Sequence, residues 1–410
     1  MAWRAWGAHA FKSFENCEST TPDGNFSDSR MRNTSKRAFD GLDIVITSVD
    51  RIDTKDFSFQ IIKNFQSKGK IMYFNDLSNN QLRVSVDLRQ TYEAYREARR
   101  NAAKYAGGMS WKRVGGHEYL IKVINRRGGS KSLGPRTPET EALHAEFVAG
   151  KARAKEREAA LGKSVKEFAG MARGVSLNRV PSIVTATLRK LDDHGLLGKN
   201  LMVIGTHAMY AYEAVAGVRF DAGLMATTDI DFLWDARTAL KLAWLDEAVA
   251  EAGVLAILRK VDHSFEPVGK SGFRAVNKAG FHVDLVKQAP HPPWKTDEPD
   301  RLAQGDLTPS WLPRIKWLLA SEKFRAVVVG QDGLPAPIVC PDPRAFAVYK
   351  QWLSEQPDRE PEKKRRDRQQ AAATIALVRE KFPHMPLDEN AERMFPASVR
   401  MFSQEGKFEL

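Results

Sequence analysis

Three aspartates in two short stretches have the residue type and spacing needed for phosphoryl-transfer chemistry. The segment TTDIDFLW (227–234) alternates polar and apolar residues. As a strand it would turn Asp229 and Asp231 to one face, roughly 6–7 Å apart. Two carboxylates held this way repel each other unless a cation lies between them. Two divalent ions roughly 3.5–4 Å apart would meet that need and are a known arrangement for phosphoryl transfer. An isolated Asp-x-Asp is more often a solvated strand, so this pair alone decides nothing.

A third carboxylate strengthens the case for a metal site. The segment GFRAVNKAGFHVDLV (272–286) has the pattern of a β-hairpin whose turn is residues 277–280. In its second strand the apolar residues would face inward, which leaves Asp284 and His282 on the opposite face. An acid on a neighbouring strand would complete a cage of three carboxylates, and His282 would orient Asp284.

A glycine turn upstream has the features of an anion site. The all-apolar run LMVI (201–204) predicts a buried strand, followed by Gly205-Thr206 and an Ala-rich helix that ends at Gly217. The backbone N–H groups and the dipole of such a helix point toward an arriving phosphate. Gly205 would let the backbone approach it, and the Thr206 hydroxyl would donate a hydrogen bond. His207 is a further candidate for reaching the phosphate.

Together these motifs resemble the DNA polymerase β-like nucleotidyltransferases. Their pattern is an apolar strand, Gly-Ser or Gly-Thr, a helix, Asp-x-Asp on a strand, and a later single Asp. Here these are Gly205-Thr206, Asp229-x-Asp231 and Asp284. The resemblance implies an NTP substrate and two Mg²⁺ (or Mn²⁺) ions bound by Asp229 and Asp231. It also implies that Asp284 binds the catalytic ion and helps to deprotonate the acceptor hydroxyl.

One departure from the superfamily concerns the spacing of these motifs. Between Thr206 and Asp229 lie 22 residues, about twice the usual length. The additional segment GVRFDAGLMA (217–226) would either form a loop over the nucleotide or displace the nucleotide.

A longer stretch resembles one branch of this superfamily. The run GTHAMYAYEAVAGVRFDAGLMATTDIDFLWD, with W-K…G-x-E-Y-L and S-L-G-P-R-x-x-E-T-E upstream, is similar to a family of bacterial predicted nucleotidyltransferases. The likeness covers approximately residues 81–385 and implies the class of chemistry, not the substrate. In the superfamily a C-terminal helical domain commonly sends a Lys or Arg toward the triphosphate. By position, Lys350 and Lys364 are the candidates, ahead of Arg366. A solvated basic helix face and a nucleic-acid contact through KKRR remain alternatives.

Composition limits the partners and the compartment. The 410 residues carry a net charge of +12, which attracts phosphate-bearing molecules such as nucleotides and nucleic acids. A generally basic solvated surface explains the charge equally well. No apolar run reaches the roughly 18 residues of a membrane span, and the N-terminus is a poor signal peptide. Cys17 and Cys340 match no metal spacing, so a reducing compartment, the cytoplasm, is expected.

The elements that must position these residues predict an α+β fold, with a mixed sheet flanked by helices. The expected domains are an N-terminal extension, partly disordered (1–80), a helical and hairpin region (81–195), a nucleotidyltransferase catalytic domain (196–340) and a C-terminal helical domain (341–410). Within them we expect a helix over 84–105, a hairpin over 111–124, a loop over 126–138, a helix over 139–160 capped by Thr137, a helix from Pro181 to about Gly195, and two helices in 341–382.

The expected reaction is transfer of a nucleoside monophosphate from an NTP to a hydroxyl of a macromolecule, protein or RNA, with release of pyrophosphate. A transferase acting on a small molecule such as an aminoglycoside is an alternative. A non-catalytic protein that binds nucleotide or nucleic acid is a third possibility, which the intact set of three acids disfavours. The base preference, the acceptor and the oligomeric state are not encoded in any motif recognised here.

Overall fold

The computed structural model describes residues 73–123, 129–235, 247–269, 272–290, 305–313, 315–388, 391 and 393–396. Every element described below belongs to the compact unit Ile71–Leu410. Most of the predicted N-terminal extension (1–80), residues 1–72, lies outside the described residues. In the described part, no helix is both long and apolar enough to cross a membrane.

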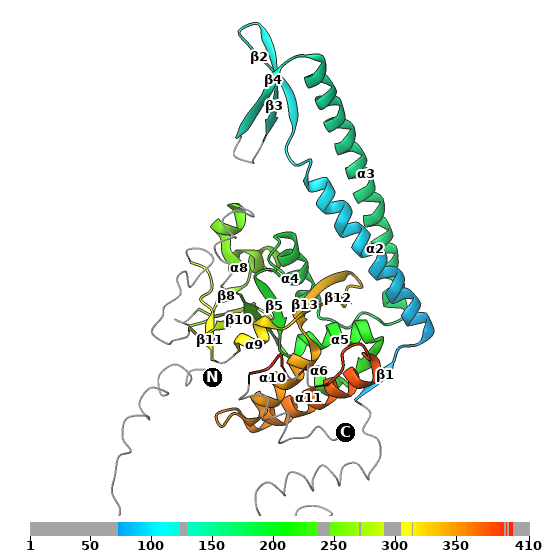
Figure 1. Cartoon of the computed structure of the whole chain (residues 1–410), viewed down its shortest axis with the longest axis vertical. Coiled ribbons are helices and arrows are strands. Elements are labelled where there is room, and N and C mark those ends of the chain that lie inside the picture. Colours follow the sequence, from blue (N-terminus) through cyan, green and yellow to red (C-terminus); the bar gives the residue numbers. More distant parts are fainter. Residues whose placement is uncertain are drawn as a thin grey trace, which may run out of the picture. The chain divides into compact units, whose positions relative to one another are not determined.

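A mixed β-sheet forms the centre of the catalytic part (Figure 1). Its strands follow the order β5 (Leu201–Ile204), β7 (Asp229–Trp234), β10 (His282–Gln288), β9 (Arg274–Val276) and β8 (Glu266–Pro267), and β11 (Ser310–Leu312) also pairs with β10. Strands β7 and β10 run parallel, whereas β5 and β9 are antiparallel to their neighbours. The side chains of Ile230, Phe232 and Trp234 are buried, as the alternation predicted.

Helices and a two-stranded ribbon surround this sheet. They are α4 (Ser182–Asp193), the 3₁₀ turn η1 (Thr206–Ala208), α5 (Met209–Ala216), α8 (Glu247–Val261), α9 (Lys316–Ala320), α10 (Pro343–Glu355), α11 (Pro361–Lys381) and the ribbon of β12 (Lys323–Val329) and β13 (Pro335–Pro341). On α4 the apolar residues Val184, Leu188 and Leu191 form one fully buried stripe. Helices α10 and α11 pack against each other. The α+β fold with a mixed sheet is therefore confirmed, whereas the predicted domain limits at 195 and 340 stay predictions.

A helical pair with its own small sheet precedes the catalytic part and is called the arm below (residues 77–181). Helices α2 (Asn79–Ala103) and α3 (Pro138–Gly174) pack together, and between them the chain forms the antiparallel sheet β2 (Met109–Val114), β3 (His117–Val123) and β4 (Ser130–Pro135). The predicted hairpin around Gly115-Gly116 is confirmed. Helix α2 begins earlier than predicted because Ser78 and Gln81 form a capping box. Helix α3 begins at the predicted Thr137 cap but continues to Gly174, since no helix breaker stops it at 160.

The prediction of a loop over 126–138 was wrong for residues 130–135, which form β4 at the edge of the small sheet. Glycine, serine and proline made this segment look irregular. Gly134 has φ 127°, and the pairing shifts register between Leu120 and Ile121. Because an edge strand tolerates proline and a bulge accommodates glycine, the segment can pair in spite of its composition.

The prediction that residues 217–226 form a loop was also wrong. Val218–Phe220 is the strand β6, which pairs antiparallel with β1 (Phe74–Asp76), and Ala222–Met225 is the short helix α6. The side chains of Phe220 and Leu224 belong to the core. Since the partner of β6 lies more than 140 residues upstream, a local pattern could not reveal the pairing. The additional length is thus a structured excursion that leaves Asp229 beside the other carboxylates.

Candidate active site

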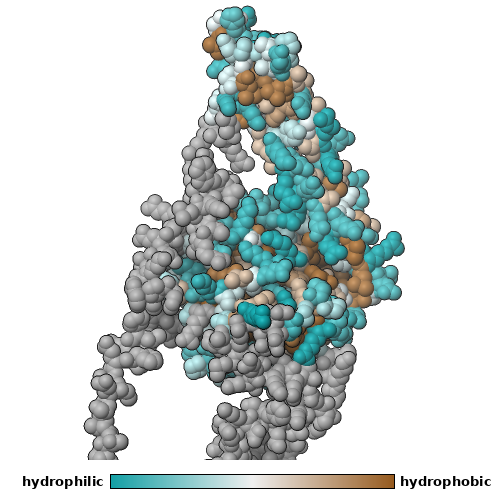
Figure 2. All heavy atoms as spheres, viewed as in Figure 1, coloured by the Kyte–Doolittle hydropathy of each residue, from teal (hydrophilic) through white to brown (hydrophobic). Residues whose placement is uncertain are grey.

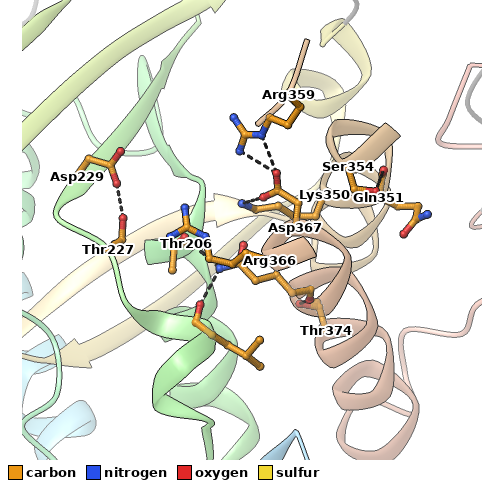
Figure 3. A network of polar contacts seen from close by, with 12 residues as sticks. Thr206, Thr227, Asp229, Lys350, Gln351, Ser354, Arg359, Arg366, Asp367 and Thr374 are labelled. Carbon is orange, nitrogen blue, oxygen red and sulfur yellow. Dashed lines mark hydrogen bonds and ion pairs between the residues drawn. The ribbon is translucent and has the colours of Figure 1, made fainter. Parts of the chain in front are cut away.

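The three predicted aspartates come together on the sheet. Asp231 on β7 and Asp284 on β10 are direct neighbours in the parallel register, and Asp229 lies opposite His282. One carboxylate oxygen from each of the three lies within 4.8 Å of the others. The hydroxyl of Thr227 also donates a hydrogen bond to Asp229 (Figure 3). Asp284 thus lies on the same side of the sheet as Asp229 and Asp231, as a shared metal site requires.

Crowding of these acids changes their ionisation. Burial, and then the charges of Asp229 and Asp284, raise the pKa of Asp231 to about 8, although Lys350 and Arg359 oppose the shift. Three carboxylates this close cannot all remain charged at neutral pH without a compensating cation. The electrostatics therefore favour either a shared proton or bound metal at this position.

Without metal, we expect the free energy of unfolding to fall as pH rises from about 4 to about 8. The folded Asp231 has a pKa of about 8 against an ordinary 3.8. Across this range the folded state holds a proton that the unfolded state has lost. This contribution to stability is present at low pH and is lost as pH rises through 8. Denaturant unfolding in EDTA from pH 4 to 9 measures it, with Asp231→Asn as the reference.

The same slope in both proteins would contradict the assignment of the slope to Asp231. Glu213, whose pKa burial raises to about 7, contributes in the same direction but is present in both proteins. The difference between their slopes therefore isolates Asp231.

Gly205 occupies a position that only glycine can fill. Its φ of 71° and ψ of −162° fall in a region almost exclusive to glycine. A Cβ built there would lie 2.3 Å from Oδ2 of Asp231. The preceding residue, Ile204, pairs with Asp231 across β5 and β7. The turn is therefore held directly against the carboxylates.

Replacing Gly205 by alanine is expected to destabilise the protein by about 1–3 kcal/mol and to displace Asp231. Backbone strain and the clash with the carboxylate act together at this position. Gly195→Ala is a matched control, because Gly195 also has a positive φ of 69° but nothing within 4 Å of a built Cβ. Denaturant unfolding and nucleotidyl transfer should both suffer more from Gly205→Ala. Equal losses of stability in the two variants would argue against the contact with Asp231.

Thr206 and His207 follow the turn and are both buried. Gln370 of α11 donates through Nε2 to the Thr206 hydroxyl at 3.1 Å and to the Leu224 carbonyl at 2.7 Å. The Thr206 hydroxyl proton thus remains available for another acceptor. Burial lowers the pKa of His207 to about 4, against the opposing charge of Asp229. At neutral pH the imidazole of His207 is therefore expected to be uncharged, which argues against His207 as a cationic ligand of phosphate.

Lys350 lies in a buried ionic cluster beside the carboxylates. Its Nζ is 2.8 Å from Oδ1 of Asp367 on α11, and Arg359 binds the other oxygen of Asp367 at 2.8–2.9 Å (Figure 3). Burial lowers the pKa of Lys350, and Asp367 counteracts that shift. Both cations interact with Asp231. The structure thus brings the predicted Lys350 to the site and adds Arg359, which the sequence argument missed.

Lys364 and Arg366 lie in the first turns of α11. Lys364 is half-buried, and its amide donates to the Glu360 carbonyl. Arg366 donates from Nη1 to the Ala226 carbonyl at 3.1 Å, immediately before Thr227. Arg366 therefore contacts the segment that leads into the strand of Asp229. Among the described residues, Lys364 has no such contact.

Arg274 is a second residue that the sequence argument missed. It donates from Nε and Nη2 to the two oxygens of Asp284, each at 2.6 Å. The hairpin pairs Arg274 with Asp284 in register. Counting back from the predicted turn at 277–280 would instead place Phe273 opposite Asp284. Because the Asn277 amide donates to the Phe281 carbonyl, the turn is one residue shorter and the register brings Arg274 to Asp284. A bidentate guanidinium neutralises the most deeply buried of the three acids.

The residues present fit a pair of hard divalent cations and a phosphate-bearing ligand. Three carboxylate oxygens within 4.8 Å are the ligands that Mg²⁺ and Mn²⁺ prefer. Several buried polar atoms around the turn have no hydrogen-bond partner among the described residues: both ring nitrogens of His207, Nε of Arg366 and Oε1 of Gln370. Since buried polar atoms normally have partners, these atoms are consistent with a site completed by a ligand.

The family follows from comparison with known proteins. Residues 182–396, slightly more than half of the chain, match the family described as Nucleotidyltransferase. The chain belongs to this family. No curated protein and no solved structure gives a significant match. The matched segment contains the glycine turn, the three aspartates and the cations of α10 and α11, and it begins after the arm.

Proposed function

We propose that the protein is a metal-dependent nucleotidyltransferase that moves a nucleoside monophosphate from an NTP to an acceptor hydroxyl and releases pyrophosphate. The family supports nucleotidyl transfer in general. The observation that carries the finer proposal is the convergence of Asp229, Asp231 and Asp284 within 4.8 Å. A protein that only binds nucleotide has no need for three clustered acids.

In this proposal Asp229, Asp231 and Asp284 hold two Mg²⁺ (or Mn²⁺) ions. When bound, such ions polarise the α-phosphate and stabilise charge on the attacking and leaving oxygens. Asp284 exchanges its contact with Arg274 for this role. Arg274 then lies close enough to stabilise negative charge on the substrate.

The triphosphate is proposed to lie between the glycine turn and α11. Gly205 permits close approach of the backbone, and the Thr206 hydroxyl donates to a phosphate oxygen. Lys350, with Arg359 beside it, supplies positive charge where pyrophosphate leaves. Lys364 remains a candidate for the same role. Arg366 is a further candidate, because it contacts the Ala226 carbonyl close to Asp229. His207 supports the turn from beneath.

The acceptor is proposed to be a macromolecule, RNA or protein, because the chain carries a net charge of +12. Transfer to a small molecule is the alternative. Arg136, which follows β4, forms ion pairs with Glu118 and Glu141 in the arm. It is therefore not proposed as part of this site.

Incubation with each of the four α-labelled NTPs, Mg²⁺ or Mn²⁺, and cell extract tests the proposal. Label is expected on an RNA or protein fraction, together with released pyrophosphate. Label on a small molecule would favour the alternative. No transfer from any NTP with either metal would contradict the proposed reaction.

A further inference from the structure

The positive charge of the chain is concentrated in the arm. Residues 77–181 hold 21 Lys and Arg but only 10 Asp and Glu, a net charge of +11. Residues 182–410, which include the family-matched segment, hold 31 of each and are neutral overall. A merely basic, solvated protein would spread its charge more evenly. The excess therefore belongs to the part that precedes the nucleotidyltransferase segment.

Within the arm, the small sheet has the strongest imbalance. Its described residues, 109–123 and 129–136, contain five cations (Lys112, Arg113, Lys122, Lys131 and Arg136) and one acid, Glu118. Glu118 is already paired with Arg136. In the described part of the chain no ion pair involves Lys112 or Lys131, and both are exposed. The sheet thus presents positive charge that its own acid does not neutralise.

One face of this sheet packs against α3. The Trp111 ring lies 5.8 Å from His144 and Lys122 lies over the ring of Phe147, both on α3. Leu120, opposite Trp111 in the register, is fully buried. Side chains on successive strand residues alternate between the two faces of a sheet. The neighbours of Trp111, Leu120 and Lys122 along their strands therefore lie on the face opposite α3.

The opposite face is open and combines rings, apolar groups, hydroxyls and the positive charge of Lys112, whereas Arg113, Lys122 and Lys131 fall on the α3 side. It carries Ser110, Lys112 and Val114 of β2, His117, Tyr119, Ile121 and Val123 of β3, and Ser130 and Ser132 of β4. Lys112 and Tyr119 are direct neighbours in the register. Val114 is 54% exposed and Tyr119 is half-buried. Figure 2 shows hydrophobic residues bordered by hydrophilic ones at the end of the arm that carries this small sheet.

The sheet is supported at a distance from the catalytic part. Near the end of α3, Arg173 donates to the Asp332 carbonyl. Closer to the sheet, Arg96 and Arg99 of α2 pair with Asp192 and Asp193 of α4. Arg99 interacts with Glu158 of α3, and from His144 to Glu158 this helix rises about 21 Å. A long, anchored support for a small charged sheet is suited to holding an extended ligand.

We propose that the open face of the β2–β3–β4 sheet binds a single-stranded nucleic acid, with Tyr119 stacking on a base and Lys112 contacting the phosphate backbone. A polyanion matches the concentrated charge, and an aromatic ring on an open sheet is a platform for bases. An acidic protein would match the charge but would not use the ring in this way. Binding at this face is independent of metal, of NTP and of the proposed transferase activity.

The test measures binding by the full chain in EDTA without NTP. The probes are labelled single-stranded RNA and DNA oligomers of about 20 nucleotides, duplex DNA of equal length, and polyglutamate. Either single strand, RNA or DNA, should bind more tightly than the other probes, and its affinity should fall steeply with salt. Tighter binding of the duplex, equal binding of polyglutamate, or no binding of any single strand would overturn the proposal.

Two variants locate the site. Lys112→Glu should weaken single-strand binding and reduce the salt dependence by about one phosphate contact. The control Lys316→Glu makes the same change of charge at an exposed position of the catalytic part and should leave binding unchanged. Tyr119→Val keeps a strand-forming residue but removes the ring, and should weaken binding about tenfold. Equal effects of Lys112→Glu and Lys316→Glu, or none from Tyr119→Val, would place binding elsewhere.

Discussion

Replacing Asp231 with asparagine is expected to lower nucleotidyl transfer at least about a hundredfold while the protein still folds. Changes that only touch the partners of a metal ligand commonly cost 10- to 100-fold, and Asp231 is proposed to bind metal directly. It lies at the centre of the cluster, opposite Asp284 in the register and against Gly205. Because asparagine has nearly the same shape, the strand and the turn should persist.

Folding and metal binding are measured beside activity to separate the possible causes. Circular dichroism should match the wild type, and in EDTA at neutral pH the variant should be at least as stable as the wild type, because it lacks the buried carboxylate whose raised pKa costs stability. Mn²⁺ binding followed by calorimetry should weaken. Asp229→Asn should behave in the same way. Asp76→Asn removes an exposed acid that pairs with Lys381 and should leave transfer unchanged. If Asp231→Asn or Asp229→Asn retains nucleotidyl transfer within a few-fold of the wild-type rate, the proposed metal-dependent mechanism is contradicted.

The positions of the three aspartates could be predicted because each depends on local rules. Alternation along a strand places Asp229 and Asp231 on one face, and a four-residue turn fixes the partner strand of the hairpin. The same counting would place Phe273 opposite Asp284, whereas the observed register differs by one residue and pairs Arg274 with Asp284, so this ion pair did not follow from the predicted turn. Gly205 was predicted as the point of close approach, and the structure adds that its missing side chain makes room for Asp231.

Contacts that depend on tertiary packing could not be predicted in this way. Asp367 and Gln370 fall on the polar side of α11, together with Lys364, and a polar helix face is usually solvated. Packing of α11 instead buries Asp367 against Lys350 and Gln370 against Thr206. The partner of β6 lies far upstream in β1. Segments whose partners are distant in sequence carry no local signal of how they will pair.

Removing the Asp367 carboxylate is expected to destabilise the protein by about 3–5 kcal/mol. Asp367 is fully buried and holds Lys350 and Arg359, whose side chains are 4% and 17% exposed. In Asp367→Ala these cations lose their counter-ion while they remain largely out of water. Denaturant unfolding near neutral pH measures the loss. Lys363→Ala removes an exposed pair with Glu360 and should cost no more than about 1 kcal/mol.

A double variant distinguishes an unpaired buried charge from a simple loss of packing. Lys350→Met with Asp367→Leu removes both members of the closest pair and fills the space with apolar atoms. Because a buried ion pair contributes little net stability over a well-packed apolar pair, this variant should recover much of the stability lost in Asp367→Ala. Arg359, the more exposed cation, can turn toward water. Transfer should nevertheless stay low in the double variant, since the charge proposed to face the leaving pyrophosphate is gone. If the double variant is as unstable as Asp367→Ala, packing rather than charge explains the loss, and the cluster would have to be regarded as part of the core.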